Sequence, residues 1–274
     1  MTDLSINGRE LTHLATTYTN LTNALVVLDA EMELFTAQLI CTYWSNLMIL
    51  RFHSHESTTE EVVLLLIRQL PTLYELDLTG QRWDELIPNT YARNKIKPIK
   101  QSQLLVLRMS CEHASTLQEI LLLCPQLTNL TLEHPQQRYN PFGRRVSVQS
   151  ALHLLCGTAV RELHLLDYGL ANEDIAGLQN TLLHTLCITG AWEKLTDNGI
   201  LDLIFTLGFL HTLEICFCHG VTYKIVVPIL SRCRTLRSFT FRTVTESKLS
   251  SSYLLLGDVL PKLYPHVKHI CVSC

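Results

Sequence analysis

One short apolar pattern recurs along most of the chain and constrains its fold more than any other feature. Residues 127–132 read LTNLTL, with leucine at the first, fourth and sixth positions. Nine segments share this spacing if other apolar residues are allowed, and their first positions are Leu47, Leu73, Leu104, Leu127, Val160, Leu183, Leu210, Leu236 and Val267. These positions are 23 to 33 residues apart, which is the interval expected of a repeat protein.

Each unit combines two hydrophobic periods. In the apolar pattern the fourth and sixth residues face one core, and the residue between them faces outward, as in a β-strand. Helix-length apolar stretches such as 60–70, 116–124 and 198–207 lie between the strands, and Ser57 with Glu60, or Asn172, would cap such helices. We therefore predict an α/β leucine-rich-repeat solenoid, a horseshoe with a parallel concave β-sheet and helices on the convex side.

The cysteines suggest a particular class of repeat. Cys124, Cys156 and Cys233 are expected at helix ends, three or four residues before the next strand pattern, and residues 194–204 read KLTDNGILDLI. These features resemble the cysteine-containing repeats of the F-box/leucine-rich-repeat family, which has a ribonuclease-inhibitor-like fold. The resemblance implies an F-box that binds a Skp-type adaptor of a cullin ubiquitin ligase, and a repeat sheet that holds the substrate.

The N-terminal residues 1–45 permit two interpretations. Residues 40–44, ICTYW, resemble the end of an F-box, but no Leu-Pro pair precedes them. Alternatively, the segment forms another strand and helix, with Trp44 in the core three residues before Leu47. We therefore divide the chain into an N-terminal cap over 1–45, either a further repeat or a degenerate F-box remnant, and a repeat domain of about nine units over 46–274.

The outward strand residues form the first candidate binding surface. Between the fourth and sixth positions of each unit, the sequence places a row of mixed charge that would line the concave face. The residues of this row predicted to contact a protein partner are Arg51, Asp77, Arg108, His164 and Glu214.

Two long insertions form the second candidate surface, because extra residues in a solenoid leave it as surface loops. They span 81–100 and 135–146, and both combine aromatic with basic residues, a composition typical of binding hot spots. The predicted contact residues there are Trp83, Tyr91, Arg138, Tyr139, Phe142, Arg144 and Arg145.

Composition argues against several other classes of function. A net charge of −3 does not favour a broad nucleic-acid or anionic-membrane surface, and no apolar run approaches the roughly 20 residues of a membrane span. The ten cysteines are expected as buried, reduced thiols of a cytoplasmic or nuclear protein. No phosphate-binding glycine loop, paired-thiol metal pattern or catalytic motif is present, so we expect no cofactor, no metal and no enzymatic activity.

We therefore expect a protein-binding scaffold. The family resemblance implies substrate recognition in a ligase with a Skp-type adaptor and a cullin. The alternative is a stand-alone interaction or inhibitor protein of the same fold.

Overall fold

The computed structural model describes residues 4–5, 8–28, 34–54, 60–78, 102–111, 113–133, 152–179, 181–190, 194–243 and 259–273. Its strands are β1 (Leu4–Ser5), β2 (Asn23–Leu28), β3 (Ile49–Ser54), β4 (Glu75–Leu78), β5 (Val106–Ser110), β6 (Asn129–Glu133), β7 (Glu162–Leu166), β8 (Thr185–Thr189), β9 (Thr212–Cys216), β10 (Ser238–Arg242) and β11 (His269–Ser273). Its helices are α1 (Gly8–Thr17), α2 (Leu34–Tyr43), α3 (Glu60–Gln69), α4 (Ala114–Leu123), α6 (Asn172–Ala176), α7 (Asp197–Ile204) and α8 (Val226–Arg232), with 3-10 turns η1 (His153–Leu155) and η2 (Tyr223–Ile225).

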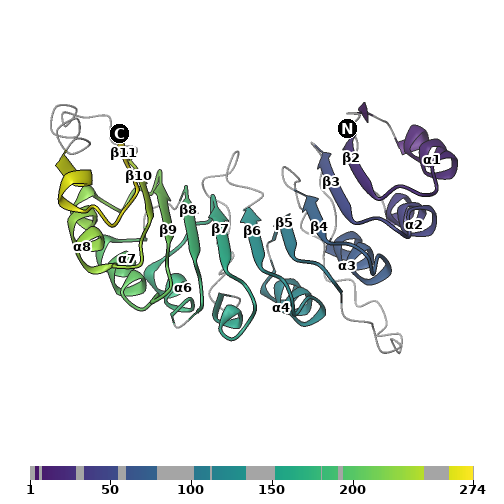
Figure 1. Ribbon diagram of the computed structural model, residues 1–274. Coiled ribbons are helices and arrows are strands. Elements are labelled where there is room, and N and C mark those ends of the chain that lie inside the picture. Colours follow the sequence, from purple (N-terminus) through teal and green to yellow (C-terminus); the bar gives the residue numbers. More distant parts are fainter. Residues whose placement is uncertain are drawn as a thin grey trace.

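The strands form one open parallel sheet in chain order. Over the described residues, each strand pairs only with its predecessor and successor, from β1 to β11. Figure 1 shows this sheet on the inner side of an arc, with helices along the outer side and the two ends of the chain at opposite tips. The predicted α/β leucine-rich-repeat solenoid is thus confirmed.

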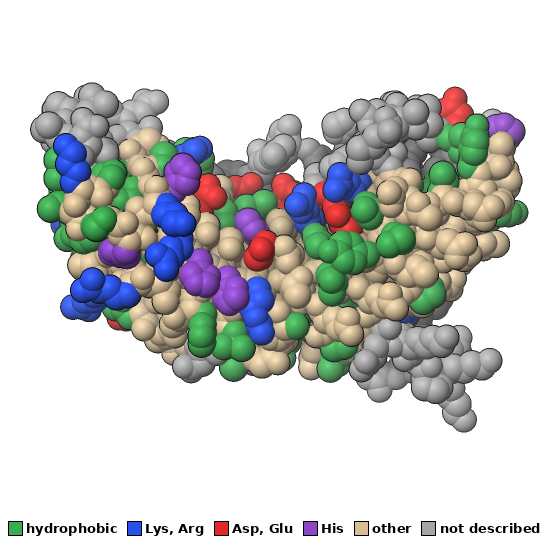
Figure 2. Space-filling model, in the orientation of Figure 1, with side chains coloured by type: hydrophobic (Ala, Val, Ile, Leu, Met, Phe, Trp, Pro, Cys, Tyr) green, Lys and Arg blue, Asp and Glu red, His purple; other side chains and the backbone are tan. Residues whose placement is uncertain are grey.

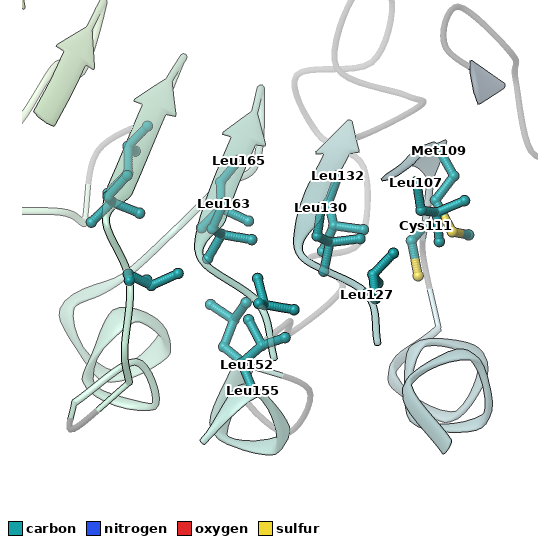
Figure 3. Close-up of a cluster of buried hydrophobic side chains, with 14 of the residues drawn as sticks. Leu107, Met109, Cys111, Leu127, Leu130, Leu132, Leu152, Leu155, Leu163 and Leu165 are labelled. Carbon is teal, nitrogen blue, oxygen red and sulfur yellow. The ribbon is translucent and has the colours of Figure 1, made fainter. Parts of the chain in front are cut away.

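The core lies between the sheet and the helices. The fourth and sixth apolar residues of neighbouring units pair in register, for example Leu130 with Leu163 and Leu132 with Leu165, and all four side chains are fully buried. Figure 3 shows these leucines extending from β6 and β7 toward the helical side, where Leu152 and Leu155 meet them. Each unit therefore buries its apolar face only because its neighbours cover both sides.

The N-terminal segment contains the strand and helix of a further unit. Strand β2 pairs in parallel with β3, and α2 follows it. Trp44 is 2 % exposed, and its carbonyl accepts a 2.9 Å hydrogen bond from the amide of Leu47. Cys124 makes the same contact with Leu127 at 3.1 Å, so Trp44 occupies the helix-end core position that cysteine holds in the later unit.

One local expectation, a helix cap, was wrong. Asn172 does not cap its helix; Ala171 is the N-cap residue, and the Asp174 carboxylate accepts from the Ala171 amide at 2.8 Å. The Asn172 side chain instead reaches the next unit, where it bonds both the amide and the hydroxyl of Thr196 at 2.9 Å. Ser57, the other proposed cap, lies outside the described residues.

The nine described cysteines are free thiols, but they are not all buried. Among the described cysteines, Cys41, Cys111, Cys124, Cys187, Cys216 and Cys218 are buried. Cys156 and Cys271 are exposed, and Cys233 is intermediate. Cys156 directly follows the 3-10 turn η1, whereas the buried Cys124 directly follows helix α4.

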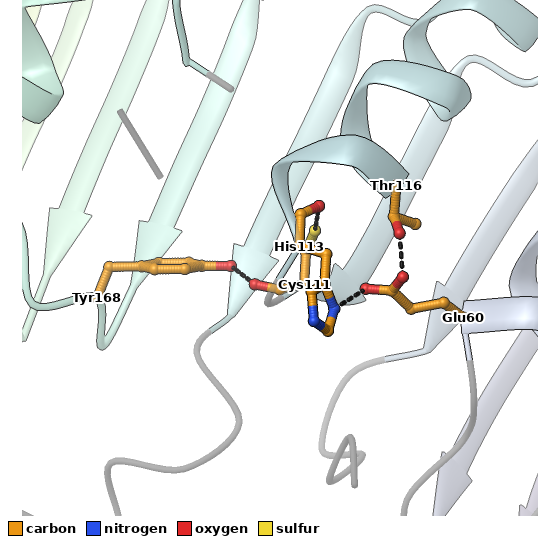
Figure 4. Close-up of polar contacts among 5 residues, drawn as sticks. All are labelled: Glu60, Cys111, His113, Thr116 and Tyr168. Carbon is orange, nitrogen blue, oxygen red and sulfur yellow. Dashed lines mark hydrogen bonds and ion pairs between the residues drawn. The ribbon is translucent and has the colours of Figure 1, made fainter. Parts of the chain in front are cut away.

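Polar side chains link units that are two apart in the stack, where the strands give way to helices. Figure 4 shows Glu60, the first residue of α3, beside the start of α4: its carboxylate lies 2.9 Å from His113 Nδ1 and accepts a hydrogen bond from the Thr116 hydroxyl. Near it, Tyr168 reaches back from the end of β7 to the carbonyl of Cys111. These contacts fix how neighbouring units stack.

Candidate functional site

The outward residue of each strand forms one continuous row across the concave sheet. The strand register places these residues directly beside one another in the order Arg51, Asp77, Arg108, Thr131, His164, Cys187, Glu214, Thr240 and Cys271. We call this set the concave row. The five contact residues predicted on the strands therefore lie along one line of the sheet, although they are distant in sequence.

The N-terminal part of the concave row consists of two ion pairs. Arg51 Nε donates to Glu75 Oε1 at 2.8 Å, and Arg108 Nη1 lies 3.3 Å from Asp77 Oδ2. The Glu75 hydrogen bond and charge, with a further contribution from Asp77, raise the pKa of the Arg51 guanidinium. Asp77 is only 4 % exposed, whereas the Arg108 side chain is 49 % exposed. Asp77 thus orients Arg108, and it is Arg108 that faces solvent.

The middle of the concave row centres on His164. Burial lowers the pKa of this imidazole, an effect that the nearby charges of Glu162 and Glu214 oppose and that of Arg108 reinforces. The Glu162 carboxylate also accepts a 2.5 Å hydrogen bond from Asn129 Nδ2 on the adjacent strand. His164 is therefore half-buried, and its surroundings favour the neutral imidazole although charges of both signs lie near it.

Toward the C-terminus, thiols lie in and beside the concave row: Cys187 belongs to it, and Cys216 lies two residues after its member Glu214. Cys187 is 5 % exposed and Cys216 2 % exposed; Cys216 donates a 3.4 Å hydrogen bond to Glu214 Oε1, and Cys187 Sγ lies 3.6 Å from Thr189 Oγ1. Burial is the main cause that raises the pKa of Cys187 to about 11 and of Cys216 to about 12. These are protonated thiols that pack into the sheet surface, and they are poor nucleophiles.

The strands β7, β8 and β9 end at residues with left-handed backbone. Asp167 (φ 59°), Gly190 (φ 71°) and Phe217 (φ 57°) each follow the last residue of their strand. A Cβ on Gly190 would lie 2.2 Å from Asp167 Oδ1, so any other residue there would displace the Asp167 side chain. Phe217 is 45 % exposed at the equivalent position, where a bulky residue is uncommon. The ring of Phe217 is thus exposed directly after β9.

Sequence reasoning missed three polar residues of this surface. Glu75, Asn129 and Glu162 lie two positions before Asp77, Thr131 and His164 in their strands. Because strand side chains alternate, residues two apart share a face, and this period could have identified them. What the sequence could not give is their pairing with groups on the neighbouring strands.

The contact residues proposed in the two insertions cannot be placed. Trp83, Tyr91, Arg138, Tyr139, Phe142, Arg144 and Arg145 all lie outside the described residues.

Within the described ranges, no three His, Cys, Asp or Glu side chains gather where they could hold a metal ion. Over the same ranges, none of the helices is both long and apolar enough to cross a membrane.

Comparison with known proteins supports the fold but gives no family. No protein-family model matches the sequence, and no curated protein matches it. Among solved structures, a chain in the crystal structure of the Rad7 and Elc1 complex in yeast is similar, with a TM-score of 0.50 and 15 % sequence identity. The match covers 88 % of this chain and 55 % of that one, so this chain spans little more than half the length of its structural neighbour. At this low sequence identity, the structural likeness shows a shared fold alone.

Proposed function

We propose that this protein is a binding scaffold whose concave face receives a protein partner. The observation that carries the proposal is the concave row itself: nine side chains from consecutive strands, aligned in register on an open sheet. A solenoid gathers a large contact area in this way, with one or two side chains from each unit.

The composition of the row suits protein recognition better than catalysis. The polar groups are spread over successive strands, and Arg51, Glu75, Asp77 and Arg108 are held by ion pairs along the sheet. Such fixed, partly exposed charges favour a partner of complementary charge pattern. We propose no enzymatic activity and no cofactor.

We further propose that this binding serves substrate recognition in a cullin-type ubiquitin ligase, through a Skp-type adaptor. Two observations support this: the resemblance of the repeats to the F-box/leucine-rich-repeat family, and a similar fold in a chain of the Rad7 and Elc1 complex. The second candidate, a stand-alone interaction protein, is favoured by the strand and helix that β2 and α2 form where an F-box would lie. Either function would be exercised in the cytoplasm or the nucleus.

A single substitution on the concave row tests the proposal. Thr131→Arg adds a large side chain between Arg108 and His164, its neighbours in register, without removing an apolar contact. The matched control is Gln118→Arg, which makes the same charge change on an exposed position of helix α4.

The readout is affinity purification from cell extract, followed by mass spectrometry. We expect the intact chain and Gln118→Arg to recover the same proteins, and Thr131→Arg to lose a subset. Recovery of a Skp-type adaptor and a cullin with all three chains would support the ligase function. Their absence, with a partner lost only from Thr131→Arg, would support the stand-alone scaffold. Identical recovery with all three chains would overturn binding at the concave row.

A further inference from the structure

A second row of residues runs along the edge of the sheet where the strands begin. In each unit this residue directly precedes the strand, and its amide donates to the carbonyl of the equivalent residue in the unit before. The bonds run from His184 to Arg161 (2.7 Å), His211 to His184 (2.8 Å), Arg237 to His211 (2.7 Å) and Lys268 to Arg237 (2.8 Å). These five residues are therefore neighbours in space, and we call them the basic row.

The basic character is confined to the C-terminal half of the solenoid. The same chain of backbone bonds passes through Thr22, Met48, Tyr74, Leu105 and Thr128 in the N-terminal units. None of those five side chains can carry a positive charge, whereas all five of the following ones can. The change at Arg161 is thus a property of this part of the chain and not a requirement of the repeat.

The side chains of the basic row are open to solvent and not neutralised. His184, His211, Arg237 and Lys268 are exposed, and Arg161 is half-buried. Over the described residues, none of the five forms an ion pair with a carboxylate. Arg161 Nη1 donates to the carbonyls of Thr158 and Val160 instead, and the His184 and His211 rings pack edge to face with centroids 5.1 Å apart.

Two apolar side chains accompany the basic row. Leu182 and Phe209 each lie two residues before a histidine of the row, and they are 45 % and 55 % exposed. Figure 2 shows Lys, Arg and His side chains gathered over the C-terminal half of the molecule, with hydrophobic side chains beside them. A surface that pairs uncompensated positive charge with exposed apolar groups is complementary to a segment with the opposite charge and its own apolar residues.

We propose that the basic row, together with Leu182 and Phe209, binds an extended acidic segment of a partner protein. Four strand spacings of about 4.8 Å give the row a length of about 19 Å. An extended peptide advances about 3.3 Å per residue, so about six residues would span it. Alternate acidic and apolar residues would meet the basic row and the apolar pair respectively.

The exposed Leu182 and Phe209 favour a protein segment over a nucleic acid as the occupant, because a phosphate backbone has no apolar side chain to place against them. Two carboxylates lie close to the strand starts. Glu162, the first residue of β7, immediately follows Arg161, and Glu214 lies two residues after Thr212, the first residue of β9. These carboxylates would repel an acidic peptide and a phosphate backbone alike, so the choice between the two rests on the apolar pair, and an RNA probe tests it. The segment we propose differs from the partner of the concave row in place and in chemistry, so the two proposals can fail separately.

The test measures binding of defined probes to the full chain by fluorescence polarisation. The first probe is a labelled ten-residue peptide of alternating glutamate and leucine, and the second replaces glutamate with glutamine. A labelled ten-nucleotide uridine RNA is the third. The row variant carries Arg237→Glu and Lys268→Glu, and its matched control carries Lys224→Glu and Lys262→Glu, two lysines exposed elsewhere.

We expect the glutamate peptide to bind the intact chain and the control about equally, and the row variant at least about tenfold more weakly. Added salt should weaken this binding, and the glutamine peptide should bind less well at low salt. Phe209→Ser should also reduce affinity, by up to about tenfold, because it removes apolar contact area. Circular dichroism and thermal melting of each variant would establish that it is folded.

Equal binding of the glutamate peptide by row variant and control would overturn the proposal, as would tighter binding of the RNA than of the peptide. Thr131→Arg should leave peptide affinity unchanged, since it lies on the concave row. A loss of peptide binding in that variant would instead place the acidic segment on the concave face.

Discussion

The phenol hydroxyl of Tyr168 donates a 2.7 Å hydrogen bond to the carbonyl oxygen of Cys111, a residue 57 positions earlier in the sequence. Tyr168 follows β7 and Cys111 follows β5, with β6 between them. The same hydroxyl lies 3.4 Å from the carbonyl of Glu133, the last residue of β6. One buried side chain, 1 % exposed, thus links the strand ends of three successive units.

Removal of this hydroxyl should loosen the middle of the solenoid. We expect Tyr168→Phe to lower the free energy of unfolding by about 1–2 kcal/mol, because a buried hydrogen bond is lost while the ring and its packing are kept. Urea denaturation followed by circular dichroism measures this change. Tyr74→Phe, at a 44 % exposed tyrosine, is the matched control and should differ little from the parent. Equal stabilities of the two variants would contradict a structural role for the Tyr168 hydroxyl.

Asp197 makes a second link between units. Its carboxylate accepts hydrogen bonds from the amide and the hydroxyl of Thr222, both at 2.6 Å, and so joins the start of α7 to the following turn. Asp197→Ala should cost about 1–2 kcal/mol of unfolding free energy, since two charge-assisted bonds disappear.

Two conservative changes serve as controls for Asp197. Asp197→Asn keeps one oxygen acceptor and should cost less than Asp197→Ala. Thr222→Ser keeps the hydroxyl donor and should be close to the parent in thermal melting. If Asp197→Asn were as unstable as Asp197→Ala, the hydrogen bonds to Thr222 would not explain the loss.

The cysteines should differ strongly in reactivity. Burial raises the pKa of Cys124 and Cys187 to about 11 and of Cys41 to about 12, so almost none of their thiolate forms at pH 8. Cys156 and Cys271 are exposed. Brief alkylation of the folded protein with iodoacetamide at pH 8, read by peptide mass spectrometry, should therefore modify Cys156 and Cys271 first.

The same alkylation in urea provides the control, because every thiol should react there at a similar rate. Early modification of Cys41, inside α2, or of Cys124, at the end of α4, in the folded protein would show that the core beneath these helices opens readily.

His164 should make stability depend on pH. Burial lowers the pKa of His164 below the ordinary value of 6.5 that it regains on unfolding, so the unfolded chain binds more protons over that interval. The contribution of His164 is therefore fully present above about pH 6.5 and is lost as the pH falls through 6.5 toward the lowered value.

The measurement compares the parent with His164→Gln in urea at pH 7.5, 6.0 and 5.0. Glu162, Glu214 and Arg108 are unchanged in both proteins, so the difference isolates the imidazole. The parent should lose more stability on acidification than the variant. Parallel losses in both would assign the pH dependence to other groups.

The sequence alone determined the architecture. The spacing of Leu130 and Leu132, repeated in every unit, requires a strand with one apolar face, and the helix-length runs between strands require a second layer. Because no unit can bury its own leucines, only a stack of units satisfies the pattern, and the sheet register follows from it. The outward residues from Arg51 to Glu214 could be assigned to one row for the same reason.

The tertiary structure decided which polar side chains are exposed and which partners they bond. Asp77 and Arg108 both occupy the concave row, yet one is buried by its ion pair and the other faces solvent. Asn172 looked like a helix cap in sequence and instead bonds to Thr196 in the next unit.

The members of the basic row directly follow the first apolar position of the last five units, 23 to 31 residues apart, so the repeat itself aligns them. Sequence periodicity reports which side of an element is buried, because burial is set by the local alternation of side chains. What the tertiary structure adds is that these side chains are exposed or half-buried and, over the described residues, form no ion pair with a carboxylate, since that depends on how whole units stack.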